Sequence, residues 1–151
     1  MSLKDWRERG WLIEHATSPE EISDLLNVIE RDIRDCRVRG LSADWRLNIA
    51  YNAALQAATI ALYACGFRAS RDAHHYRVIQ SLRFTLASDN SLILQLDHFR
   101  KKRNISDYER AGRVSDAEAE EALELAISLR GPRPVKWCKK LHHAIHFAMT
   151  A

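Results

Sequence analysis

The stretch of the sequence with the clearest chemical potential is DHFRKKRNISDYE, residues 97–109. Four cationic side chains fill positions 100–103, and Asn104, Asp107 and Tyr108 follow them. A guanidinium stays charged at physiological pH and donates up to five hydrogen bonds, which suits it to phosphate or carboxylate oxygens. The residue types therefore indicate recognition of an anion.

The position of Arg103 on its helix is unusual for a cation. Leu92, Leu96 and Phe99 lie at i, i+4 and i+7, and Arg103 at i+11 continues the same apolar stripe. This spacing predicts that Arg103 points inward or toward a partner, where a guanidinium removed from water needs acceptors. The alternative is structural: a cation near a helix C-terminus interacts favourably with the helix dipole, and Asp107 is placed for an i, i+4 pair.

Hydrophobic periodicity around this stretch predicts a succession of helices and no strands. Ser18 with Glu21, and Ser115 with Glu118, match the capping pattern that begins a helix. The predicted helices cover residues 18–40, 42–66, 71–86, 90 to at least 104, 115–131 and 134–149. The sequence has no glycine-rich phosphate loop and no internal repeat. We therefore predict an all-α bundle and expect no cofactor.

The predicted helix 42–66 is rich in alanine, which allows neighbouring helices to approach closely on several sides. Asn48, Asn52, Gln56 and Thr59 form one polar stripe along it. The stripe either faces solvent or lines a polar cleft or subunit contact. The second interpretation is suggested by the absence of long charged side chains, although buried amides must be hydrogen-bonded.

Composition restricts the class of protein without identifying a function. The 151 residues, 46% of them hydrophobic, suit one domain spanning residues 1–151, with a core at 18–130 and a basic C-terminal helix at 134–149. A net charge of +3 is too small to indicate a nucleic-acid binder, but it permits a local basic patch. Three cysteines, a charged beginning and no long apolar run predict a cytoplasmic protein without disulfides or membrane segments.

Three segments together resemble the HEPN superfamily, over most of residues 18–130. They are YNAALQAATIALYACGFR, HHYRVIQSL and RKKRNISDYE, the last of which looks like the Arg-Asn-x-x-Asp-Tyr motif of one branch. The resemblance implies an up-and-down antiparallel bundle of about five helices plus a C-terminal helix. It also implies a homodimer that places two motifs around a cleft.

The resemblance further implies a toxin–antitoxin, defence or regulatory role. RNA or a nucleotide would be bound through Arg100, Arg103 and Asn104, and a minimal nucleotidyltransferase antitoxin is a possible partner. Many members of the superfamily are metal-independent ribonucleases with a histidine after the arginine. Residues 105–114 contain no histidine, so catalysis would require Asp107 or Tyr108 to act with Arg103. A non-catalytic helical adaptor is the third alternative.

The remaining histidines offer weaker candidates. The pair His74 and His75 suits a capping or packing role, with chemistry as a secondary possibility. Cys138, His142 and His146 lie at i, i+4 and i+8, a spacing that permits metal ligands. Cys138 belongs to an apolar stripe, however, and no nearby acid or second cysteine completes a tetrahedral set. We therefore predict no metal site.

Overall fold

The computed structural model describes residues 1–108 and 112–131, with only the backbone described for residues 105–108. Its elements are α1 (Leu3–Glu8), β1 (Leu12–Glu14), α2 (Pro19–Cys36), α3 (Ala43–Ala64), β2 (Phe67–Ala69), α4 (His74–Thr85), α5 (Asn90–Tyr108) and α6 (Asp116–Arg130). The predicted helix 134–149 lies outside the described residues. The prediction of an all-helical bundle is confirmed.

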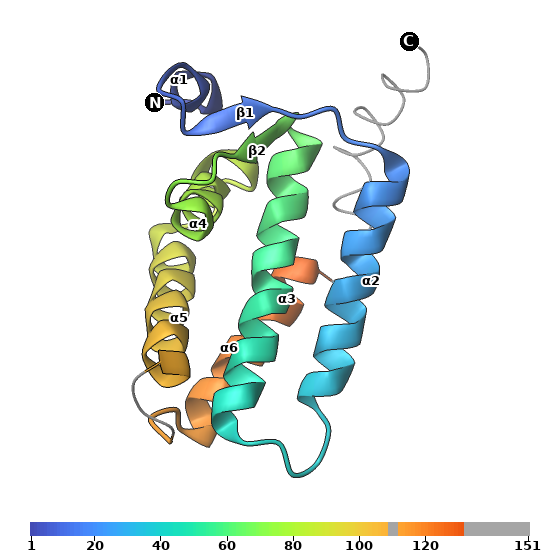
Figure 1. Cartoon of the computed structure of the whole chain (residues 1–151), viewed down its shortest axis with the longest axis vertical. Helices are drawn as coiled ribbons and strands as arrows, with labels where there is room; N and C mark the ends of the chain where they lie inside the picture. The colour runs from blue at the N-terminus through green and yellow to red at the C-terminus, as the bar shows by residue number, and fades with distance from the viewer. Residues whose placement is uncertain (109–111, 132–151) are drawn as a thin grey trace.

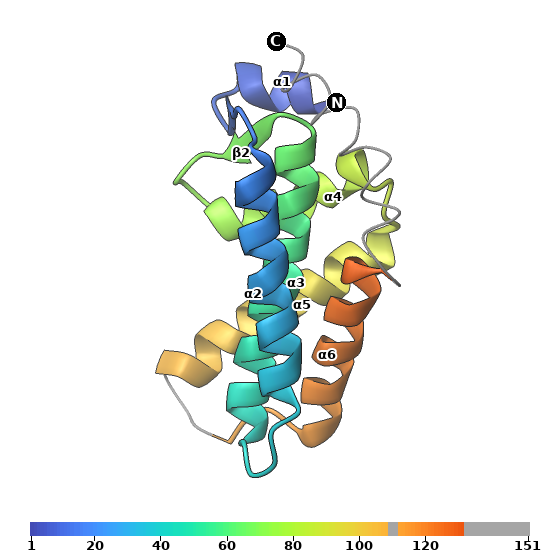
Figure 2. The ribbon, with the colours of Figure 1, turned by 90° about the vertical axis from the view of Figure 1, so that its right-hand side faces the viewer.

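The long helices alternate in direction around α3 (Figure 1). The chain descends along α2, ascends along α3, descends again through α4 and α5 in succession, and ascends along α6. In the second view, α5 is inclined to α2 and α3 (Figure 2). The helix α3 therefore contacts all four of the other long helices, which makes it the centre of the bundle.

Serine caps determine where three of these helices begin. The hydroxyls of Ser18, Ser42 and Ser115 each accept a hydrogen bond from the amide three residues on. This interaction satisfies one of the amides that a helix N-terminus leaves without an intrahelical acceptor. The predicted starts at Ser18, Ser42 and Ser115 are thus confirmed.

A sharp break separates α4 from α5. Ala87 adopts a left-handed conformation with φ of 49°, and the Ser88 amide donates to the Leu82 carbonyl at 3.2 Å, which ends α4. At the start of α5, the Asp89 carboxylate accepts a hydrogen bond from the Leu92 amide at 2.9 Å. The break lets α5 change direction and bring its C-terminal half across α3.

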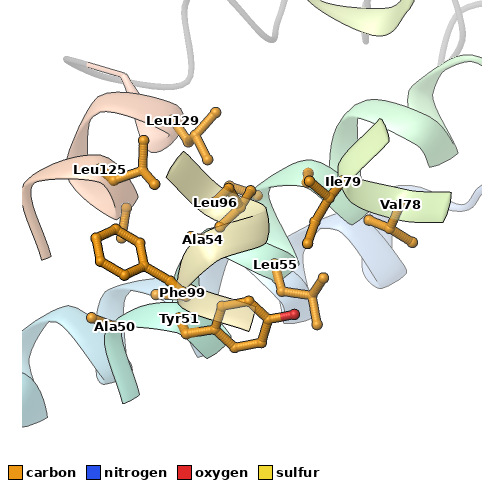
Figure 3. Packing of buried hydrophobic residues seen from close by; sticks show 14 of the residues in the cluster. Ala50, Tyr51, Ala54, Leu55, Val78, Ile79, Leu96, Phe99, Leu125 and Leu129 are labelled. Carbon is orange, nitrogen blue, oxygen red and sulfur yellow. The ribbon is translucent and has the colours of Figure 1, made fainter. Parts of the chain in front are cut away.

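The helix α5 packs against buried alanines of α3. Ala50 and Ala54 are buried, and Leu96 and Phe99 of α5 lie against this part of α3 (Figure 3). Leu125 of α6 lies beside the same cluster. The burial of Leu96 and Phe99 fixes the rotation of α5, and that rotation determines where the cationic residues at its C-terminal end point.

The sequence patterns did not predict a small unit at one end of the bundle. The strands β1 and β2 pair antiparallel, with Ile13 opposite Arg68. Trp6 of α1 is buried and makes edge-on contacts with Trp11 and Phe84. These aromatic contacts attach the N-terminal segment to α4.

Candidate anion-binding site on α3, α4 and α5

Arg103 lies across the interface between α5 and α3. Its Nε donates a hydrogen bond to Oδ1 of Asn48 at 2.7 Å. Its guanidinium carbon is 5.3 Å from the centre of the Tyr51 ring, within range of a cation–π interaction. Arg103 is half-buried, and these two contacts with α3 orient its guanidinium.

A tyrosine and a histidine adjoin this guanidinium. The hydroxyl of buried Tyr51 and Nδ1 of half-buried His75 are 3.2 Å apart. Burial raises the pKa of Tyr51 to about 12, despite the opposing effect of the Arg103 charge. Burial also lowers the pKa of His75, and the charge of Arg103 acts in the same direction. Both groups are therefore predominantly neutral at physiological pH.

Arg100, one turn earlier on α5, is held by a carboxylate and an aromatic ring. Its Nε donates to Oδ1 of Asp97 at 2.7 Å, and its guanidinium carbon is 5.7 Å from the Tyr76 ring centre. Burial raises the pKa of Asp97, but hydrogen bonds from Arg100 and Lys101 and their charges outweigh that effect and bring it below its ordinary value. The Asp97 carboxylate thus pairs with both Arg100 and Lys101 at this end of α5.

The polar stripe of α3 forms hydrogen bonds with two neighbouring helices, α5 and α2. Asn48 serves Arg103 of α5, whereas Nδ2 of Asn52 donates to Oδ2 of buried Asp32 on α2 at 2.6 Å. Gln56 in turn donates to Asn52 at 3.4 Å. The stripe therefore links α5 and α2 through α3, and its three amide residues are half-buried.

Not all of the predicted site residues can be compared with the structure. Arg100, Arg103 and Asn48 lie on facing elements, and Asn104 is exposed. The side chains of Asp107 and Tyr108 lie outside the described residues, so their predicted catalytic roles stay predictions. The tyrosine at position 51, in contrast, was not among the predicted residues. Its spacing of three from Asn48 placed it near the same turn, but only the fold reveals its contacts with α4 and α5.

In the described part of the chain, no group of three or more histidine, cysteine, aspartate or glutamate side chains could hold a metal ion. No helix there is both long and apolar enough to cross a bilayer. Comparison of the chain with models of protein families, with curated proteins and with solved structures finds no match.

Proposed function

We propose that this protein is a HEPN-type protein that binds the phosphate groups of RNA or of a nucleotide, within a toxin–antitoxin, defence or regulatory module. The observation that carries the proposal is the fixed, half-buried guanidinium of Arg103, oriented by Asn48 and Tyr51. A guanidinium has five N–H donors, so it can serve Asn48 and still donate to another acceptor. Asn104, exposed on the same helical turn, adds an amide donor.

The distribution of charge supports a phosphate ligand at this end of α5. Residues 97–108 contain two arginines, two lysines and two aspartates, and Lys102 pairs with Glu118 of α6 at 3.3 Å, whereas α6 itself contains five acidic residues and one arginine. The net charge of +3 for the whole chain conceals this polarity. A local positive field attracts phosphate even when the total charge is small.

Anisotropy of a labelled RNA, measured at several salt concentrations, tests the proposal. We expect Arg103→Ala to weaken binding by roughly tenfold or more, because a charge-assisted hydrogen bond contributes about 1.5–3 kcal/mol. The matched control is Arg34→Ala, which removes an exposed arginine from α2. Affinity should fall with salt, less steeply for Arg103→Ala than for the wild type. Equal affinity of wild type and Arg103→Ala, or binding insensitive to salt, would contradict the proposal.

The proposed assembly is a homodimer, with a minimal nucleotidyltransferase as a further partner. Sedimentation of the wild type should give the mass of two chains, and Arg103→Ala tests whether the site contributes to assembly. A monomer at all concentrations would remove the dimer from the proposal. A change of mass in Arg103→Ala without a change in the RNA affinity would support the adaptor alternative.

A ribonuclease is the second candidate, and His75 is the observation that favours it. An imidazole whose pKa is lowered is a competent proton acceptor at neutral pH, and His75 lies beside the Tyr51 and Arg103 pair. It would accept the proton of a ribose 2′-hydroxyl as the 2′-oxygen attacks the phosphorus, the bond to the 5′-oxygen breaks and that oxygen takes a proton from water, while Arg103 stabilises charge on the phosphoryl oxygens.

Cleavage of several RNAs in the presence of a chelator tests this second function. His75→Gln should abolish cleavage and leave RNA affinity intact, whereas loss of cleavage in Asp107→Asn or Tyr108→Phe alone would assign the chemistry to the predicted pair. Absence of cleavage by the wild type would leave the binding function without an activity.

A further inference from the structure

Arginines and aromatic rings form a chain of contacts that joins the N-terminal segment to α4 and α5, beyond the Arg103 site. The guanidinium carbon of Arg77 on α4 lies 3.7 Å from the centre of the Trp11 ring and 5.6 Å from that of Tyr76. At the far end, Arg9 lies 5.1 Å from the Trp11 ring. The N-terminal segment and α4 therefore share a set of stacked cations and rings.

The same chain of contacts reaches the Arg103 site through α5. Arg100 lies 5.7 Å from the Tyr76 ring, and Arg103, one turn further along α5, lies 5.3 Å from the Tyr51 ring. The aromatic–arginine row is the set formed by Arg9, Trp11, Arg77, Tyr76, Arg100 and Arg103.

We propose that the aromatic–arginine row is a binding path for single-stranded RNA, which extends from Arg103 toward the N-terminal unit. The inference rests on the proposed function, because Arg103 would hold one phosphate of the strand. It narrows the ligand from any nucleotide to an unpaired strand of several nucleotides. Exposed bases stack on aromatic rings and on guanidinium planes, while phosphates accept hydrogen bonds from the same arginines.

Structural packing explains only part of the row. Trp11 is half-buried and packs against the core, next to Trp6, a core residue outside the row that also lies near Arg77. Tyr76 is 39% exposed, and Arg9 is exposed as well. A ring that stacks on a base must present a face to solvent, and the exposure of Tyr76 meets that requirement.

The charge around the row fits a polyanion. Residues 66–86, which contain β2 and α4, hold four arginines and two histidines with a single aspartate. Together with the cationic residues of α5, they give this part of the chain more basic than acidic side chains. An RNA strand along the row would release counterions at each phosphate that it places there.

A length series of labelled oligouridylates tests the path. The probes are a single nucleotide and strands of about four and about ten nucleotides, a range that covers typical single-strand sites. We expect the wild type to bind the longer strands more tightly than the single nucleotide. Tyr76→Ala should weaken the longer strands by roughly fivefold or more and the single nucleotide by clearly less, and Tyr76→Phe should restore the affinity.

Two controls separate the row from general effects. Trp45→Ala removes an aromatic side chain that is 61% exposed outside the row, and its affinity should equal that of the wild type. A duplex of the longer length should bind less tightly than the single strand, because its bases are stacked inside the helix. Urea unfolding of Tyr76→Ala, compared with wild type, confirms that the folded state persists.

The outcomes distinguish this inference from the function on which it rests. If Arg103→Ala loses binding but Tyr76→Ala binds long strands as the wild type does, the row is refuted and the phosphate site stands. Equal affinity for duplex and single strand, or an equal loss in Trp45→Ala, also refutes the row. If the wild type binds neither the nucleotide nor any strand, the proposed function itself fails.

Discussion

Nε of Arg103 and Oδ1 of Asn48 form a 2.7 Å hydrogen bond between α5 and α3. The amide is a neutral acceptor, so it orients the guanidinium and leaves its charge uncompensated by this contact. A carboxylate at position 48 would orient the same group but would neutralise it. An amide at this position therefore orients Arg103 without placing a negative charge beside it.

Asn48→Asp should weaken RNA binding several-fold without destabilising the fold. The new carboxylate can accept the same hydrogen bond from Arg103 and adds a charge-assisted pair, but it cancels the positive field at the site. Anisotropy gives the affinity, and urea unfolding gives the free energy of unfolding. Asn27→Asp, an equal change of charge at an exposed position of α2, is the control. Unchanged or tighter binding by Asn48→Asp would show that Arg103 is not part of an anion site.

The contact between Asn52 and Asp32 predicts a destabilisation that depends on pH. Asn52→Asp would replace the donor 2.6 Å from the buried Asp32 carboxylate by a second carboxylate. Loss of a hydrogen bond to a charged group, with added repulsion, should cost about 2–3 kcal/mol at neutral pH. The pair should also raise the folded-state pKa of one carboxyl. Stability should then recover as the pH falls through that raised pKa.

Urea unfolding of Asn52→Asp and wild type between neutral and mildly acidic pH measures this effect, with the difference between the two proteins plotted against pH. The exposed Asn27→Asp variant should show no such recovery. A penalty for Asn52→Asp that stays constant with pH would mean that the two carboxylates do not face each other.

The lowered pKa of His75 predicts that acid destabilises the protein in one pH window. Burial, followed by the Arg103 charge, holds the folded-state pKa below the ordinary value of about 6.5. As the pH falls below that value, the unfolded chain takes up the proton before the folded chain does, so the free energy of unfolding decreases until the folded-state pKa is reached. His75→Gln keeps a polar partner for Tyr51, and in this variant the free energy of unfolding, measured by urea unfolding, should depend less steeply on pH. Equal slopes in the two proteins would contradict the assignment.

The helices were predictable because their signals are local. The apolar spacing of Leu96 and Phe99 and the capping serines each operate within one or two turns. The placement of Arg103 at the end of the Leu96 and Phe99 stripe also followed from spacing. The structure adds its partner: an amide on another helix, Asn48, which lies 55 residues away in the chain.

The missed features are short or depend on distant contacts. The six residues of α1 and the three-residue strands β1 and β2 are too short to show a period. The start of α4 at His74, three residues after the predicted one, follows Ala73 in a left-handed conformation, which alanine does not favour. The approach of His75 to Tyr51 depends on how α4 packs on α3, and helical spacing carries no information about that packing.

The central position of α3 predicts that its small residues cannot be enlarged. Ala57 is fully buried in the helix that all four other long helices contact. Ala57→Leu should therefore destabilise the protein by about 1–3 kcal/mol, because a well-packed core accommodates added carbons only by shifting its neighbours. Ala64→Leu, at the half-buried end of the same helix, is the control for helix propensity and added apolar surface. Urea unfolding measures both variants. Equal stability of Ala57→Leu and wild type would show that space remains around α3, and the alanines would then not be needed for the close approach of the helices.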